Sequence, residues 1–204
     1  MTLFLVTFGF LVAGALGFRS LRRTLIAVAL ASLLGSGLFI VQGPHSREPL
    51  VLLNVFAQVL PTSIAEIVVC WVVIGAMAEA LTRTRGSVVS LVVGMVAASV
   101  LFGVYHFAHS PPFNEVGVVV FLMLIGIGTS LVYFFGRDVY ATIIFHTFQG
   151  MFGILGSADL DVFRQPLYPL YVLALLGAAA LITVHVLIIR PAARYQEAAS
   201  SAVD

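Results

Sequence analysis

Residues 49–82 read PLVLLNVFAQVLPTSIAEIVVCWVVIGAMAEALT, and this apolar stretch, long enough to cross a membrane, carries an acid at Glu66. A carboxylate in hydrocarbon is unfavourable unless it is paired, protonated or in contact with water, so an acid within a span indicates a functional site. Polar side chains recur every four residues around it: Asn54, Gln58, Thr62, Glu66 and Cys70. This spacing places neighbouring polar side chains on one helix face, which drifts by about 40° at each step.

The whole chain has the composition of a membrane protein. Of its 204 residues 61% are hydrophobic and only 9% are charged, and the mean hydropathy is +1.11. A soluble domain of this size carries many more charges. The net charge of +1 gives no indication of nucleic-acid binding. The single cysteine, Cys70, lies in an apolar segment and excludes a disulfide framework.

Seven hydrophobic segments predict an all-α, polytopic helix bundle that forms one transmembrane domain over residues 1–204. The segments are approximately 1–18, 24–42, 50–82, 87–108, 116–135, 139–156 and 168–190. The first has no basic residue before it, so we expect a span rather than a cleaved signal peptide. The third is longer than a bilayer requires, so we expect a kink at Pro61 or an interfacial position for residues 50–60. The polar tail, 191–204, should be disordered at its end.

All ten basic residues are arginines, and their positions predict an orientation. If the N-terminus lies outside, eight arginines fall inside and two, Arg47 and Arg164, fall outside. The inside set is Arg19, Arg22, Arg23, Arg83, Arg85, Arg137, Arg190 and Arg194. The positive-inside rule then predicts an integral membrane protein with its N-terminus outside and its C-terminus inside, which we expect in a prokaryotic cell membrane.

Two histidines lie deep in predicted spans. The fourth segment ends LFGVYHFAHSPPF, where Phe102 and His106 share a helix face at i, i+4. A histidine at the depth of His106 needs a polar partner, whereas His109, nearer the interface, is expected to be a polar anchor.

The sixth segment, RDVYATIIFHTFQGMFG, carries the second deep histidine, His146. Gln149, Gly150 and Gly153 follow at +3, +4 and +7, on the same helix face. Two interpretations are equally compatible with this pattern. The small residues form a packing seam between helices, or they leave a gap beside the imidazole where an extended peptide can lie.

Together, Glu66, His106 and His146 supply the groups that peptide hydrolysis needs. A carboxylate in a low-dielectric site can hold and return a proton, so Glu66 could activate water while the histidines stabilise the oxyanion. The same three side chains could instead bind a divalent metal such as zinc. Their spacing cannot separate the two alternatives, because they lie on different helices.

The remaining polar residues in apolar surroundings have structural interpretations. Glu79 and Arg83 form an i, i+4 pair near the inner end of the third segment, with Glu79 as a reserve candidate for the acid. His45 lies in a polar loop and should be solvated. His185 has no acidic neighbour nearby in sequence and should be a packing or interface residue. Cys70 should be a small core residue, because it has no local base to make it a nucleophile.

The order of a Glu, an F-x-x-x-H motif and a later His resembles the CAAX protease and bacteriocin-processing family of intramembrane endopeptidases. Residues 102–106, FGVYH, look like its second motif, and residues 133–153, YFFGRDVYATIIFHTFQGMFG, look like its third. Residues 61–66, PTSIAE, resemble the entry to its first motif, Glu-Glu-x-x-x-Arg. The family-like core is about 58–156. The resemblance implies cleavage of a membrane-embedded or lipidated peptide or protein.

Three positions depart from the family pattern. The second Glu of the first motif falls on Ile67, and its Arg falls on Trp71. The Asn usually found four residues after the last His falls on Gly150, although Gln149 is adjacent.

An alternative alignment places Glu79 and Arg83 on the first motif. It keeps the second Glu and the Arg but loses the first Glu, which the resemblance implies is the acid that activates water. We prefer Glu66, because Arg83, Arg85 and Gly86 then form the basic turn before the next helix.

The leading hypothesis is an intramembrane glutamic-type peptidase that requires no cofactor. Glu66 acts as general base on water, and His106 and His146 bind the water or the oxyanion. The supporting residues are Thr62, Phe102, Gln149 and Gly150. The second hypothesis, motivated by the departures, is a non-catalytic homologue with an interaction or immunity role. The third is a haem- or metal-binding membrane protein.

One geometric condition must hold for this site. At about 1.5 Å per residue His146 lies only about 13 Å along its helix from Arg137, whereas Glu66 and His106 lie about 25–30 Å from their basic turns. The turn at residues 136–138 must therefore be sunk into the protein, or the helices must tilt strongly.

Overall fold

The computed structural model of the chain describes residues 17–191, and within that range it contains helices joined by short turns and no strand. In chain order they are α2 (Leu21–Gln42), α3 (Pro49–Glu66), η1 (Ile67–Gly75), α4 (Ala76–Leu81), η2 (Arg83–Arg85), α5 (Ser87–Tyr105), η3 (His106–Ala108), α6 (Val116–Gly136), α7 (Val139–Ser157), η4 (Leu160–Arg164), α8 (Tyr168–Val184) and η5 (His185–Ile189). Here η1 and η5 are π-helical, and the other η segments are 3₁₀ turns.

Six of the described helices are long and apolar enough to cross a membrane. They are Leu21–Gln42, Pro49–Leu81, Ser87–Ala108, Val116–Gly136, Val139–Ser157 and Tyr168–Ile189. They match six of the seven predicted segments to within a few residues, and the all-α helix bundle is confirmed. The first predicted segment and most of the polar tail lie outside the described residues.

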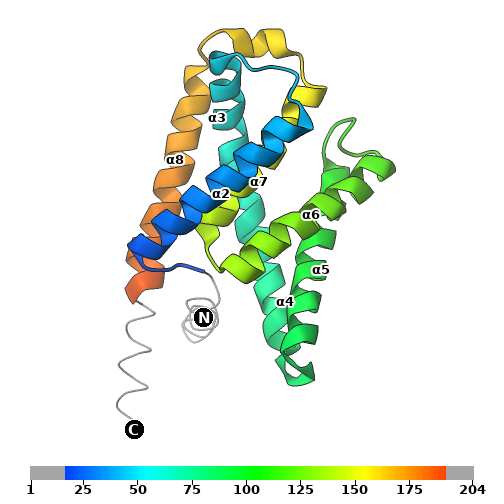
Figure 1. The fold of residues 1–204 in the computed structure, drawn as a ribbon, viewed down its shortest axis with the longest axis vertical. Helices are drawn as coiled ribbons and strands as arrows, with labels where there is room; N and C mark the ends of the chain where they lie inside the picture. Colours follow the sequence, from blue (N-terminus) through cyan, green and yellow to red (C-terminus); the bar gives the residue numbers. More distant parts are fainter. Residues whose placement is uncertain (1–16, 192–204) are drawn as a thin grey trace.

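The third span is one long helix through the molecule, built from α3, η1 and α4 (Figure 1). Pro61 lies inside α3, which continues through it, and the change from α- to π-helical hydrogen bonding begins only at Ile67. In the first turns, Val51 and Val55 are fully buried in the bundle. The wide π-helical turns therefore begin directly after Glu66, a placement common near functional sites.

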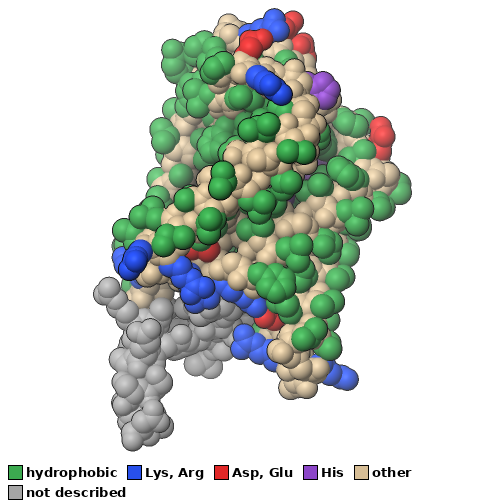
Figure 2. Space-filling model, viewed as in Figure 1, with side chains coloured by type: hydrophobic (Ala, Val, Ile, Leu, Met, Phe, Trp, Pro, Cys, Tyr) green, Lys and Arg blue, Asp and Glu red, His purple; other side chains and the backbone are tan. Residues whose placement is uncertain are grey.

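The long helix organises the packing of the other spans. Its α3 part packs against α7 and α8, its η1 and α4 parts pack against α5, and α6 contacts both α5 and α7. The main core lies where these elements meet, around Trp71, Phe102 and Tyr133. The outer surface is largely apolar, as a lipid-facing surface must be, and the basic side chains gather towards its ends (Figure 2).

The turn between α6 and α7 runs from an exposed residue, Gly136, to a buried one, Asp138, so that α7 begins inside the protein. Asp138 is 1% exposed and caps α7 by accepting hydrogen bonds from the Ala141 amide at 2.9 Å and the Thr24 hydroxyl at 2.7 Å. Gly17, at φ +66°, lies against this turn, where a Cβ atom would come within 2.7 Å of the Arg137 backbone. Figure 1 shows α6 strongly tilted, with its end well above the α4–α5 turn. The helix that carries His146 therefore begins at a buried residue, Val139.

A partly buried ion pair joins the same turn to α4. Both guanidinium nitrogens of Arg137 donate to the Glu79 carboxylate, at 2.7 and 2.5 Å, and these bonds raise the pKa of Arg137. The predicted pairing of Glu79 with Arg83 is wrong. Arg83 is exposed on the last turn of the span, whereas Arg137 lies in the α6–α7 turn beside α4.

We expect Arg137→Ala to lower the free energy of unfolding by about 2–4 kcal/mol, because it leaves the buried Glu79 carboxylate unpaired. Thermal unfolding in detergent measures the loss. Arg83→Ala is the matched control, since Arg83 makes no ion pair within residues 17–191, and it should leave Tm unchanged. Equal losses in the two variants would contradict the pairing with Arg137.

Candidate active site

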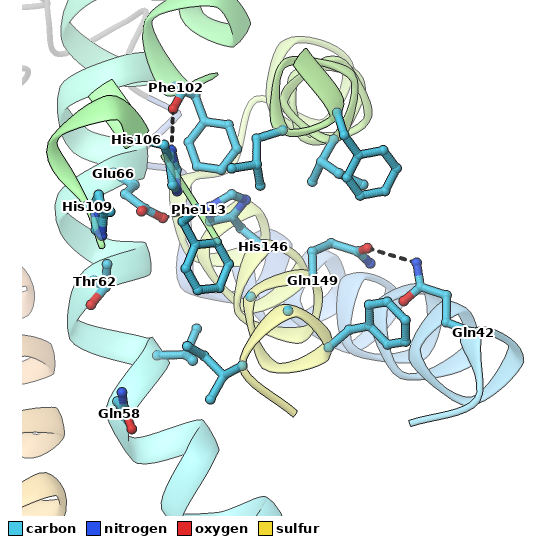
Figure 3. Close-up of a pocket in the computed structure, with 18 residues that line it drawn as sticks. Gln42, Gln58, Thr62, Glu66, Phe102, His106, His109, Phe113, His146 and Gln149 are labelled. Atoms are coloured by element: carbon cyan, nitrogen blue, oxygen red, sulfur yellow. Dashed lines mark hydrogen bonds and ion pairs between the residues drawn. The ribbon is translucent and has the colours of Figure 1, made fainter. Parts of the chain in front are cut away.

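A cavity of about 260 Å³ opens between α3, α5, α6 and α7, and it contains the three residues singled out in the sequence (Figure 3). Glu66 comes from the end of α3, His106 from the end of α5 and His146 from the middle of α7. The structure brings all three to one cavity, although 80 residues separate Glu66 from His146.

Glu66 and His146 are in direct contact. Nε2 of His146 lies 2.8 Å from Oε2 of Glu66, and the two side chains are 3% and 12% exposed, respectively. The carboxylate in the span therefore has the polar partner that burial demands. The other carboxylate oxygen, Oε1, accepts no hydrogen bond from any described residue. It is therefore free to accept one from a molecule in the cavity that Glu66 lines.

The His146 ring is held on every side. Its Nδ1 lies 3.0 Å from the Thr129 hydroxyl of α6. The Phe102 ring meets it edge-on at 4.9 Å between centroids, and the Trp71 ring packs against it at 5.4 Å. Two hydrogen bonds and two aromatic contacts therefore fix its orientation.

His106 is oriented by its own helix. Its Nδ1 lies 2.6 Å from the Phe102 carbonyl, and its ring packs edge-on against the Phe102 ring at 4.8 Å, as expected for that residue pair. Because a carbonyl oxygen can only accept, Nδ1 carries the proton. In the neutral ring Nε2 then has a lone pair available to the cavity.

His109 also lines the cavity, which differs from the expectation of a polar anchor. Its ring stacks on His106 at 4.9 Å with an interplanar angle of 23°. The chain turns sharply after α5, and this turn brings His109 back over His106.

The glycines of α7 have two different roles. A Cβ atom at Gly150 would come within 2.6 Å of Val59 Cγ1, so α3 and α7 touch there and this part is a packing seam. A Cβ atom at Gly153 would meet Phe113 at an ordinary 3.7 Å, and Gly153 lines the cavity. The packing interpretation therefore holds at Gly150, which also borders the cavity, and the gap for a peptide beside His146 stays a prediction.

Gln149 borders the cavity with an unused donor. Its Oε1 accepts a hydrogen bond of 3.3 Å from Gln42 of α2, whereas its Nε2 is buried and has no acceptor within the described residues. This nitrogen is available to a carbonyl oxygen of a bound molecule.

The polar residues that recur every four positions in α3 have two different surroundings, because their side chains point in gradually changing directions around the helix. Gln58, Thr62 and Glu66 line the cavity. Asn54 instead binds the segment before α8, donating to the Phe163 and Gln165 carbonyls at 2.8 and 2.9 Å. Cys70 lies in the core, as predicted, and is 2% exposed.

A comparison with known protein families shows the family of this chain. Residues 48–152 match the model of the Rce1-like family, described as type II CAAX prenyl endopeptidase Rce1-like. The chain belongs to this family. The predicted resemblance is thus confirmed, and the chain is an integral membrane protein of a protease family. No curated protein and no solved structure matches it.

The departures from the family pattern have a structural basis in this Rce1-like chain. Ile67 and Trp71 are both fully buried in the main core, and Trp71 donates to the Ser130 hydroxyl at 2.8 Å. An Asn in place of Gly150 would collide with Val59. Glu79, the reserve acid, is outside the cavity lining and is held by Arg137.

The third hypothesis was a metal or haem centre. Among the described residues no group of three His, Cys, Asp or Glu side chains is arranged to hold a metal ion. His45 is exposed, and His185 is a packing residue, as predicted, hydrogen-bonded to the Tyr140 hydroxyl at 2.7 Å.

Two residues that contact the site were not predicted from the sequence. Thr129 and Trp71 both contact His146, yet the first lies on a different span and the second resembles an ordinary core residue. A signal did exist for Thr129, because Thr129 and Ser130 are adjacent hydroxyl residues in an otherwise apolar span.

The contact between α3 and α7 predicts unequal effects of adding a methyl group to two glycines. Gly150→Ala should destabilise the protein by about 1–3 kcal/mol, because it overpacks against Val59. Gly153→Ala should be tolerated. Thermal unfolding in detergent compares them, and Val59→Ala combined with Gly150→Ala should recover stability. The seam is wrongly placed if Gly150→Ala unfolds at the wild-type temperature.

Proposed function

We propose that this Rce1-like protein is an intramembrane endopeptidase that hydrolyses a peptide bond in a membrane-embedded or lipidated protein or peptide. The observation that carries the proposal is the Glu66–His146 contact of 2.8 Å inside a cavity shared with His106. An acid and two imidazoles that converge in an apolar bundle are the groups needed to activate water and stabilise an oxyanion.

Glu66 is the general base in this proposal. Its Oε2 is occupied by His146, and its Oε1 is available to take a proton from a water molecule in the cavity. The surrounding apolar helices keep the dielectric low, which strengthens each electrostatic interaction at the reacting atoms.

His106 holds the water. Because its Nδ1 donates to the Phe102 carbonyl, its Nε2 can accept a hydrogen bond from that water. The water then donates one proton towards Glu66 and the other towards His106. This arrangement directs its lone pair at the substrate carbonyl carbon.

His146 and Gln149 stabilise the oxyanion that forms. The Nε2–H of His146 donates to Oε2 of Glu66, which becomes a weaker acceptor once Glu66 has taken the proton of the water, so this N–H can then be shared with the oxyanion. The buried amide nitrogen of Gln149 has no acceptor among the described residues. Gln149 thereby supplies the amide that the family pattern places at the position of Gly150. After attack, Glu66 returns its proton to the leaving amine.

The cavity walls suit one short segment of an apolar substrate. Gln58 and Thr62 border it on the α3 side, and Phe121, Leu122 and Ile125 form an apolar wall on the α6 side. Its volume of about 260 Å³ admits a short stretch of chain and excludes a folded domain. The family description, a prenyl endopeptidase, supports a lipidated substrate.

The departures at Ile67, Trp71 and Gly150 motivated a non-catalytic homologue as the alternative. In the structure these positions are filled by packing, whereas Glu66, His106 and His146 remain together at the cavity. We therefore favour the enzyme.

The test is cleavage of a membrane-embedded peptide by purified protein. Glu66→Gln should lower kcat by on the order of 10²–10⁴-fold, because Gln can accept a hydrogen bond from His146 but cannot take a proton from water. His106→Ala and His146→Ala should lower kcat comparably. Glu115→Gln, an exposed loop acid outside the cavity, is the matched control and should cleave like the wild type. Undiminished cleavage by Glu66→Gln would overturn the proposal.

Metal removal separates this mechanism from a zinc-dependent one. We expect cleavage to survive dialysis against 1,10-phenanthroline, because Nδ1 of His106 and both nitrogens of His146 already have protein partners. The rate before and after dialysis is the measurement. Loss of cleavage that added zinc restores would show instead that the three residues act as metal ligands.

A further inference from the structure

The hydroxyl of Thr129 is used differently from those of the other buried threonines. Three threonines in the described residues are buried. Thr142 and Thr147 donate to carbonyls four residues earlier in their own helix, at 2.7 and 2.8 Å, the ordinary arrangement in an apolar helix. Thr129 instead bonds to Nδ1 of His146, on the neighbouring helix, at 3.0 Å.

This contact restricts which ring nitrogen of His146 carries the proton. A neutral imidazole has one N–H and one bare nitrogen. If the proton were on Nδ1, the Thr129 hydroxyl would have to accept, and its own proton would have no acceptor among the described residues. The bare Nε2 would then face the Glu66 carboxylate at 2.8 Å, lone pair against lone pair.

The opposite tautomer gives every donor an acceptor. The Thr129 hydroxyl donates to a bare Nδ1, and the Nε2–H of His146 donates to Glu66. A hydrogen bond at one ring nitrogen sets the role of the other, so the hydroxyl behind the ring decides what the ring presents to the cavity.

We propose that Thr129 is a positioning residue that holds His146 as the Nε2–H tautomer, with its proton directed into the cavity. This inference rests on the proposed function, because it specifies why His146 acts as a donor. It also gives the two histidines opposite tautomers: His106 presents a lone pair to the water, and His146 presents a proton to the oxyanion.

The surroundings keep Thr129 in place. The adjacent Ser130 accepts from Trp71 at 2.8 Å and donates to the Met95 carbonyl at 3.2 Å, with Ser99 3.0 Å away. These bonds join α6 to α5 and η1 at the residue next to Thr129, so they fix the part of the α6 backbone that carries Thr129.

The first experiment is ¹⁵N NMR of the histidine-labelled protein in detergent micelles, with the His146 signals identified by their absence in His146→Gln. The wild type should show a bare Nδ1 and a protonated Nε2. Thr129→Val should lose this pattern, Thr129→Ser should restore it, and Thr147→Val should match the wild type. Thr147 is the matched control, because it is an equally buried threonine beside His146 that bonds only to its own helix.

The second readout is cleavage of the embedded peptide. Thr129→Val should lower kcat by on the order of 10²-fold with little change in KM, the effect of losing one oxyanion donor, and Thr129→Ser should recover it. A wild-type spectrum with the proton on Nδ1 would overturn the inference, even if Thr129→Val failed to fold. So would an unchanged tautomer in folded Thr129→Val. If the tautomer changes as expected but Glu66→Gln cleaves normally, the proposed function fails and the role of Thr129 in setting the tautomer stands.

Discussion

The contact between Glu66 and His146 is the constraint on which the rest of the structure depends. A carboxylate in the middle of a span is tolerated only with a polar partner, and that partner lies on a helix 80 residues away. To reach it, α7 must approach α3 closely, which Gly150 permits by removing any Cβ atom from the face of Val59. The contact therefore explains a glycine where the family pattern has an amide.

The same contact requires α7 to begin below the protein surface. A helix cap and an ion pair make this possible. Asp138 caps the buried start of α7, and Arg137 beside it pairs with Glu79 of α4. Protein groups thus satisfy the polar backbone and the charges of the turn. The second acid of the long helix serves the turn, and this role leaves Glu66 as the acid of the cavity.

The sequence predicted what depends on composition and local spacing. Six spans and the choice of Glu66, His106 and His146, which do line one cavity, could be inferred, because polar residues in apolar segments are conspicuous. The partners that join different helices could not be inferred, because no local sequence pattern indicates them. Glu79, for example, pairs with Arg137 rather than with Arg83. The contacts of Thr129 and Trp71 with His146 were hidden for the same reason.

Trp71 shows how a departure from the family pattern can remain compatible with a working site. Where the family has an arginine, Trp71 fills the core and packs on the His146 ring at 5.4 Å, while its N–H is satisfied by Ser130. It adds no charge to the bundle, so the carboxylate of Glu66 keeps His146 as its direct partner. The orientation of the imidazole then depends on packing and on one hydroxyl, both of which are neutral.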